Sequence, residues 1–290
     1  MLSINPHDLS SAQLQAYLQS AVAPRPIAFA STMNSKGQPN LSPFSFFNVF
    51  SANPPILIFS PARRVRDNSI KHTLLNVQDL HEVVINVVDY AMVQQMSLSS
   101  SEYAEGVNEF VKAGLTPIPS MIVKPYRVQE APVQFECKVN QVIALGNQGG
   151  AGNLVICEVL KIHISEAIID EKGAIVQEKL DLVARLGGNW YSRANAGLFE
   201  VPKPLTTLGI GVDAIPDFIK NSGLFTGNDL GVLANVAALP SPAEVAIFVK
   251  ENFELKAVLS ADDHIKQLNL ALSYLHKNEV EKAWKILLAQ

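Results

Sequence analysis

The sequence predicts a mainly β domain followed by an α-helical extension. Over about residues 1–203, Val, Ile and Phe are concentrated in short runs bounded by turn residues, a pattern typical of strands. From about residue 204 onward, the apolar residues recur at helical spacing instead. The chain has 290 residues, of which 48% are hydrophobic and 17% charged, so it can bury a core in each part. We therefore expect two domains, 1–203 and 204–290.

The first expected element is a helix over residues 11–21. Ser10 and Gln13 have the spacing of a capping box, and an apolar face follows them. Residues 90–113 are also expected to be helical. The expected strands are the apolar runs 26–32, 40–51, 55–60, 82–88, 132–145 and 153–165.

A glycine-rich segment, GNQGGAGN, joins the last two of these runs at residues 146–153. A dinucleotide-binding fingerprint needs a strand before such a loop and a helix after it. Here a second β-rich run follows, so we interpret the segment as a flexible hairpin.

The helical extension contains one well-marked helix start. Ser241 is a capping residue, Pro242 falls in the first turn and Glu244 completes a capping box. Apolar residues then share helical faces. These faces could cover barrel surface or extend a dimer interface, and a lid or a docking surface for a partner stays an alternative.

Composition excludes several classes of protein. The formal net charge of −4 gives no electrostatic reason to expect nucleic acid or an anionic membrane as partner. The N-terminus does not resemble a secretion signal, and no apolar run approaches the ~20 residues of a membrane span, so we expect a cytoplasmic protein. Cys137 and Cys157 both fall in strand-like runs and are expected to be buried thiols, with a disulfide or redox pair as the alternative. The histidines form no metal-spaced cluster, so no metal site is predicted.

The segment NLSPFSFFNVF, residues 40–50, is the first candidate for a binding site. Pro43 has no N–H for a sheet ladder, so the strand should be an edge, a bulge or broken there. Backbone N–H groups around Phe44 to Phe47 could then point at a ligand. A flavin ring would suit an apolar wall with polar backbone groups, although a Phe cluster at strand spacing is also compatible with ordinary core.

The segment ARRVRDNSIKHT, residues 62–73, combines cations with hydroxyl groups. Arg63, Arg64, Arg66 and Lys71 alternate with Ser69 and Thr73, and such a set can hold a phosphate. A solvated basic loop is the alternative. Because this run follows a buried strand that itself follows the aromatic segment, a ring site and an anion site on consecutive strands would suit flavin mononucleotide (FMN).

Several motifs together resemble the flavin reductase-like, FMN-binding split-barrel family, which includes flavoredoxin. They are PRPIAFAST, NLSPFSFFNVFSANPPILIFS, RR followed by KHT, EVVINVV and RLGGNWYSR, within residues 20–203. The resemblance implies a split β-barrel that forms a homodimer with FMN at or near the subunit interface. It places these residues at the cofactor: Ser31, Thr32, Ser45, Phe46, Phe47, Asn48, Arg64, Lys71 and Thr73. Tyr191 and Arg193 are weaker candidates.

The chain departs from the family at one position. Lys71-His72-Thr73 stands where the family commonly has Lys-Asp-Thr, so a carboxylate that could orient the cations is missing. This puts the tightness of FMN binding in question more than its identity.

Two functions are compatible with the resemblance. The first is an NAD(P)H-dependent flavin reductase, in which NADH or NADPH as co-substrate passes a hydride to FMN and no catalytic side chain is required. The second is a flavoredoxin-like electron carrier that retains FMN and exchanges electrons with a redox partner protein. A scaffold that has lost its flavin is a third reading.

Overall fold

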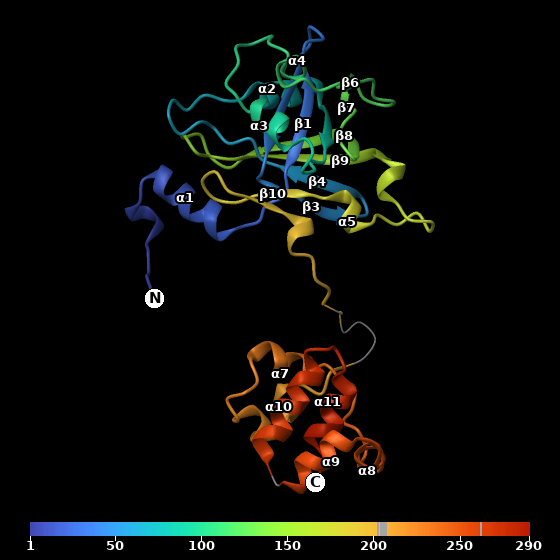
Figure 1. The fold of residues 1–290 in the computed structure, drawn as a ribbon. Helices are drawn as coiled ribbons and strands as arrows, with labels where there is room; N and C mark the ends of the chain where they lie inside the picture. Colours follow the sequence, from blue (N-terminus) through green and yellow to red (C-terminus); the bar gives the residue numbers. More distant parts are fainter. Residues whose placement is uncertain (202, 204–207, 262) are drawn as a thin grey trace. The chain divides into compact units, whose positions relative to one another are not determined.

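The computed structural model describes residues 1–201, 203, 208–261 and 263–290, which form two compact units (Figure 1). The first unit is Met1–Phe199 and the second is Glu200–Gln290. The boundary between the units thus falls at 199/200, a few residues before the expected boundary at 203/204. Residue 204 is outside the described residues.

A seven-stranded antiparallel sheet forms the body of the first unit. Its strand order is β2-β1-β5-β8-β9-β4-β3. The strands are β1 Ala28–Met33, β2 Pro39–Phe44, β3 Phe47–Ala52, β4 Pro55–Phe59, β5 Glu82–Asn86, β8 Val133–Ala144 and β9 Asn153–Ile164. Each run expected to be a strand contains at least one strand. The glycine-rich segment lies in the hairpin between β8 and β9, as predicted.

The run expected as one strand over residues 40–51 is two strands, and the break closes the sheet. β2 and β3 are the two opposite edges of the sheet, yet only Ser45 and Phe46 separate them in sequence. Two residues cannot span an open seven-stranded sheet, because neighbouring strands lie ~4.8 Å apart. The sheet must therefore curl until its edges meet, which gives the split barrel. Pro43 lies in the edge strand β2, where its missing N–H costs no ladder hydrogen bond.

Two buried clusters lie on the two sides of this sheet. One joins inward residues of six strands to Leu74 and Val77 of helix α2, His72–Leu80, and contains both cysteines as free, buried thiols. Burial raises the pKa of both thiols. The other cluster packs Phe29 and Leu41 against helices α3, Val93–Leu98, and α4, Glu109–Ala113.

The remaining elements of the first unit are short, apart from the N-terminal helix. They are α1 Ser11–Ala21, α5 Gln177–Leu180, β6 Pro117–Ile118, β7 Arg127–Val128, β10 Val183–Arg185, β11 Tyr191–Arg193 and 3-10 turns at Pro6–Asp8, Glu166–Ile168 and Ala194–Ala196. The α1 prediction is confirmed, including the Ser10–Gln13 capping box. The helix expected over 90–113 is only α3 and α4, with irregular chain between them.

The second unit is a helical domain with a core of its own. Its helices are α6 Asp217–Lys220, α7 Gly227–Ala234, α8 Pro242–Glu251, α9 Phe253–Ser260, α10 His264–Leu275 and α11 Val280–Leu287, after a 3-10 turn at Val212–Ala214. The predicted Ser241–Glu244 capping box starts α8. Trp284 is fully buried and its indole N–H donates to the Leu233 carbonyl at 3.0 Å.

The expected β domain followed by an α-helical extension is confirmed, but the label mainly β does not hold for the chain as a whole because of the second unit. Helical residues outnumber strand residues over the described chain, so the fold class is mixed: a split-barrel β domain plus a helical domain. None of the helices in the described part of the chain has the length and apolar character needed to cross a membrane.

Candidate functional site

A cavity of about 400 Å³ brings the two candidate segments together. One wall is the bend between β2 and β3, the second is the cationic segment after β4, and the third is helix α1. Its lining is Gln15, Gln19, Pro43, Phe44, Ser45, Phe46, Ser60, Ala62, Arg63, Arg64, Val65, Arg66, Lys71 and Glu102. Four of the nine predicted cofactor residues, namely Ser45, Phe46, Arg64 and Lys71, meet here.

The bend supplies both apolar surface and unsatisfied backbone donors. Phe44 is buried against Phe59 with ring centroids 5.4 Å apart, whereas the Phe46 side chain is 37% exposed. Among the described residues, no acceptor receives a hydrogen bond from the backbone N–H of Ser45 or of Phe46. The carbonyl of Phe46, by contrast, accepts from the Ser60 N–H at 2.8 Å. This bond fixes the bend while its N–H groups stay available to a ligand.

The cationic segment is held in place by its own loop. Arg63 donates to the Asn68 side chain at 2.6 Å and to the Asn68 carbonyl at 3.0 Å. Arg64 uses one nitrogen, Nη1, for Ser69 Oγ at 2.9 Å and for the Ile70 carbonyl at 3.3 Å. Because these contacts are local, they orient the guanidinium groups without any ligand.

The glycine-rich hairpin supports the same segment from behind. The Gly150 N–H donates to the Arg63 carbonyl at 2.9 Å, and the Arg63 N–H donates to the Ala151 carbonyl at 2.8 Å. A Cβ on Gly149 would lie 3.0 Å from the carbonyl oxygens of Arg64 and Val65. The glycines therefore let two stretches of backbone approach closely, which is a structural role in building the cavity.

Among the described residues, Lys71 has no charged partner in direct contact, and it differs from Arg63 in having no hydrogen-bond partner for its charged group either. Its Nζ lies 5.2 Å from the centre of the Phe44 ring, and within the described chain it makes no ion pair or hydrogen bond. Burial and, secondly, repulsion from Arg64 lower the pKa of Lys71, while Glu102 partly offsets them. Lys71 is thus held part-buried and uncompensated, which costs stability in the absence of an anion.

A second, smaller cavity of about 70 Å³ shares Arg64, Lys71 and Glu102 with the first. Thr73, at the N-terminal turn of α2, also lines it, together with a row of hydroxyl groups. Its full lining is Asn40, Ser42, Arg64, Lys71, His72, Thr73, Ser99, Ser100, Ser101, Glu102, Tyr103 and Glu109. Arg64, Lys71 and the N-terminus of α2 can attract a compact anion to this small polar space, which the carboxylates of Glu102 and Glu109 also line.

The other four predicted cofactor residues line neither cavity. Ser31 and Thr32 are fully buried in β1, where Thr32 Oγ1 accepts from Asn76 at 3.0 Å. Phe47 packs against the barrel core, and Asn48 is exposed on β3 with its side chain bonded to the Val49 N–H.

Tyr191 and Arg193 belong to a separate cavity of about 180 Å³. Arg193 forms a bidentate ion pair with Asp181, at 2.7 and 2.8 Å, and stacks 4.0 Å from the centre of the Tyr90 ring. In the described structure, neither residue lines the cavities that hold Lys71.

Sequence reasoning missed Glu102, which reaches the cationic segment from the irregular chain between α3 and α4. Its carboxylate lies 3.2 Å from Arg64 Nε and 2.9 Å from Arg66 Nη2. Hydrogen bonding to Arg66 lowers the pKa of Glu102 below its usual range. A carboxylate therefore contacts the arginines after all, although His72 replaces the acidic residue of the family motif. No local spacing pattern links positions so far apart.

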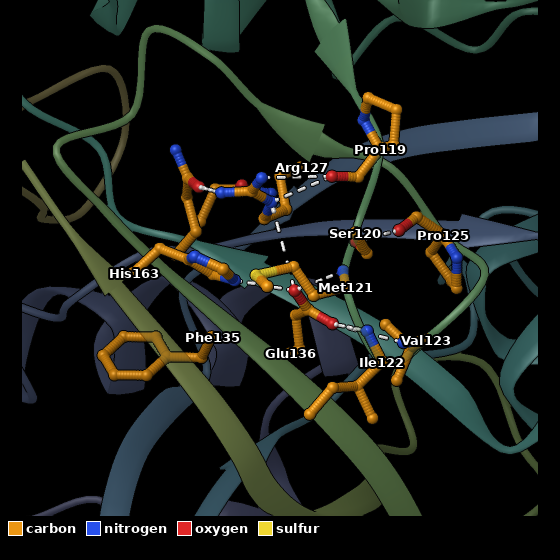
Figure 2. Close-up of polar contacts among 12 residues, drawn as sticks. Pro119, Ser120, Met121, Ile122, Val123, Pro125, Arg127, Phe135, Glu136 and His163 are labelled. Carbon is orange, nitrogen blue, oxygen red and sulfur yellow. Dashed lines mark hydrogen bonds and ion pairs between the residues drawn. The ribbon is translucent and has the colours of Figure 1, made fainter.

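Sequence reasoning also missed Glu136, a fully buried carboxylate on β8 (Figure 2). It accepts from the backbone N–H groups of residues 121–123 at 2.6–3.2 Å and lies 2.6 Å from His163 Nε2. Burial alone would raise the pKa of Glu136, but these hydrogen bonds outweigh it and lower the pKa. Both oxygens are engaged, so Glu136 anchors the 119–125 segment to the barrel and is not a free base.

Fold and site together define a split-barrel protein with a cation-lined cavity at the barrel bend. The chain belongs to the flavin reductase-like family: the model of the Flavin reductase like domain matches residues 20–179, more than half of the chain.

Similar proteins cover the first unit. An uncharacterised protein of Aquifex aeolicus is 40% identical over 173 residues, which is 60% of this chain and 86% of the relative. The structure of nitrilotriacetate monooxygenase component B from Bacillus cereus has a TM-score of 0.65 at 30% identity and covers 69% of this chain and 98% of that one. Flavoredoxin of Desulfovibrio vulgaris, with a TM-score of 0.54 at 20% identity over 64% of this chain and 93% of its own, shows the shared fold alone.

Proposed function

We propose that the first unit binds FMN in the cavity at the barrel bend and acts as an NAD(P)H-dependent flavin reductase. One observation carries the proposal: the cavity joins an apolar bend to a cationic segment, and within the described chain two backbone N–H groups of the bend and the Lys71 ammonium have no hydrogen-bond partner. These are the two complements that a ring with a polar edge and a terminal phosphate require.

The bend is suited to the ring. The N–H groups of Ser45 and Phe46 can donate to acceptor atoms on the polar edge of a flavin, and the exposed part of Phe46 can contact its apolar face. Because the Ser60–Phe46 hydrogen bond fixes the bend, the two donors are preorganised and lose little freedom on binding.

The cations are suited to the phosphate. Arg64 and Lys71 face both cavities, and Thr73 with the serine hydroxyls of residues 99–101 adds neutral donors in the smaller one. Four cations and two carboxylates line the two cavities, so the surplus charge is positive and complements a dianionic phosphate.

When bound, FMN supplies the redox chemistry, since its ring accepts a hydride from a reduced nicotinamide. The chain's own contribution would be placement: Arg64, Lys71 and Thr73 would hold the phosphate, and the N–H groups of Ser45 and Phe46 would orient the ring edge. None of these tasks requires an acid or base, and we assign no catalytic side chain.

The reductase is tested by mixing FMN-loaded protein anaerobically with NADH and with NADPH in a stopped-flow instrument. Loss of the oxidised-flavin absorbance within the mixing experiment, with either nucleotide, is the expected result. If the flavin stays bound and keeps its colour with both nucleotides, the protein is no reductase, and an electron carrier of the flavoredoxin type becomes the better description.

We further propose that the first unit forms a homodimer through exposed apolar residues of β3 and β9. Phe50, on the edge strand β3, is 63% exposed, and Ile162 on β9 is 52% exposed, with Leu160 and Val49 also open to solvent. Apolar residues gathered on strands at and near a sheet edge are typical of a protein interface. The bend leads directly into β3, so an interface that includes β3 would lie close to the proposed flavin cavity.

A further inference from the structure

Glu102 holds a position that an anionic ligand would need. Its two carboxylate oxygens contact Arg64 and Arg66 at 3.2 and 2.9 Å, and it lines both cavities beside Lys71. The carboxylate therefore already provides, from within the chain, the negative charge that the cationic segment attracts.

The arginine that faces both cavities does not depend on Glu102 for its placement. Arg64 is anchored through Nη1 to Ser69 Oγ and to the Ile70 carbonyl, and Glu102 contacts only its Nε. If Glu102 left, the Nε edge of Arg64 would become free while the guanidinium stayed oriented.

Glu102 itself is held weakly. Its side chain is 53% exposed, and it lies in irregular chain between the end of α3 at Leu98 and the start of α4 at Glu109. Exposed ion pairs contribute little net free energy because water competes for both partners. The ion pairs of Glu102 therefore occupy the arginines in the free protein, yet they are weak enough for an anionic ligand to replace them.

We propose that Glu102 is an internal competitor of the FMN phosphate: it occupies Arg64 and Arg66 in the free protein and is displaced when the phosphate binds. The inference rests on the proposed function. FMN can then bind only to the molecules in which Glu102 has left the arginines. The apparent affinity equals the intrinsic affinity multiplied by the fraction of such molecules. Glu102 is accordingly a specificity-determining residue that weakens FMN and makes it exchangeable, while riboflavin, which has no phosphate, is unaffected.

The test compares FMN and riboflavin affinities of the full chain by quenching of flavin fluorescence. Glu102→Gln removes the charge and keeps the size; we expect FMN to bind about 3- to 30-fold more tightly, and riboflavin to change less than about twofold. Glu105→Gln is the matched control. It removes the same charge from the same segment, but within the described chain Glu105 makes no ion pair and lines a different cavity. It should change neither affinity by more than about twofold.

The outcomes separate the two claims. Wild-type protein that binds no FMN would refute the proposed function. Wild-type protein that binds FMN, with Glu102→Gln binding it equally or more weakly, would refute the competitor role alone; weaker binding would mean that Glu102 positions the arginines. Equal gains for FMN and riboflavin, or equal gains in the Glu105→Gln control, would also overturn it. Glu102→Asp keeps the charge and should retain the weak wild-type affinity for FMN.

Discussion

Replacing Lys71 by methionine should weaken FMN binding without lowering the stability of the folded protein, so the two effects of this side chain can be measured separately. In the folded protein the ammonium is part-buried, lies against the Phe44 ring and faces Arg64 without a charged partner of its own. The substitution keeps most of the length and the apolar character of the stem, and it removes the ammonium group with its charge and its N–H donors. We expect it to weaken FMN binding while leaving the folded protein as stable as before, or more stable.

The magnitude follows from the contact that is lost. A hydrogen bond between a charged donor and a charged acceptor contributes about 1.5–3 kcal/mol, which is a loss of about 10- to 150-fold in FMN affinity. Riboflavin lacks the phosphate and should change less than about twofold. The stability should move the other way, because burial and repulsion from Arg64 disfavour the charged lysine in the folded state.

The same residue gives FMN binding a pH dependence. The folded-state pKa of Lys71 is lowered, so its charge disfavours folding fully at pH values below that pKa. The cost shrinks as the pH rises above the folded-state pKa and is gone only above the unfolded-state pKa of a lysine, ~10.4. FMN affinity should therefore begin to fall at a pH below the ~10.4 at which a lysine of ordinary pKa loses its proton. Riboflavin affinity should not follow this fall.

The assay is a fluorescence titration with both flavins, paired with urea unfolding of the free protein. Lys36→Met is the control, because it removes an equal charge from a residue that lines a different cavity. Equal losses of FMN and riboflavin affinity in Lys71→Met would refute the phosphate assignment, since the side chain would then be acting through packing. A destabilised protein would refute the claim that the charge of Lys71 costs stability.

Three further changes test the surroundings of the site. Glu136→Gln should lower the free energy of unfolding in urea by about 1–3 kcal/mol, because an amide cannot accept all the N–H groups of residues 121–123. Phe50→Asp should shift the protein from dimer to monomer in sedimentation velocity, since it places a charge in the proposed interface. Gly149→Ala should weaken FMN binding, because its Cβ would crowd the carbonyl oxygens of Arg64 and Val65 and displace the arginine segment.

Each of these has a clear contrary result. Wild-type stability in Glu136→Gln would show that the carboxylate is not the anchor of the 119–125 segment. A Phe50→Asp protein of unchanged mass would exclude this face as the interface. Gly197→Ala, whose added Cβ meets no atom within 4 Å, is the control for Gly149→Ala, and equal FMN affinities of the two variants would dismiss the role of the hairpin.

Local signals in the sequence predicted local structure well. The Ser10–Gln13 and Ser241–Glu244 capping boxes both form, because each is decided by residues three apart. Pro43 correctly indicated an edge strand near a break, since a residue without an N–H is tolerated only there. The convergence of the aromatic and cationic segments also followed from their succession along the chain.

Features that depend on contacts between residues far apart in the sequence could not be predicted from local sequence patterns. Helix α2 begins without a capping side-chain bond and owes its place to Leu74 and Val77, which pack into the barrel core. The contact between Glu102 and Arg64 joins residues 38 positions apart, so no periodicity reports it. The family resemblance implied a place for Thr32 at the cofactor, but here its side chain is buried in β1 and its Oγ1 accepts a hydrogen bond from the Asn76 side chain of α2.

The most direct test of the account is a titration of purified wild-type protein with FMN and, separately, with riboflavin. We predict saturable binding of one FMN per chain, tighter than that of riboflavin, with the preference lost when Lys71 is replaced by methionine. A protein that takes up neither flavin, or that binds both equally with Lys71 intact, would contradict the claim that this cavity holds FMN by its ring and its phosphate.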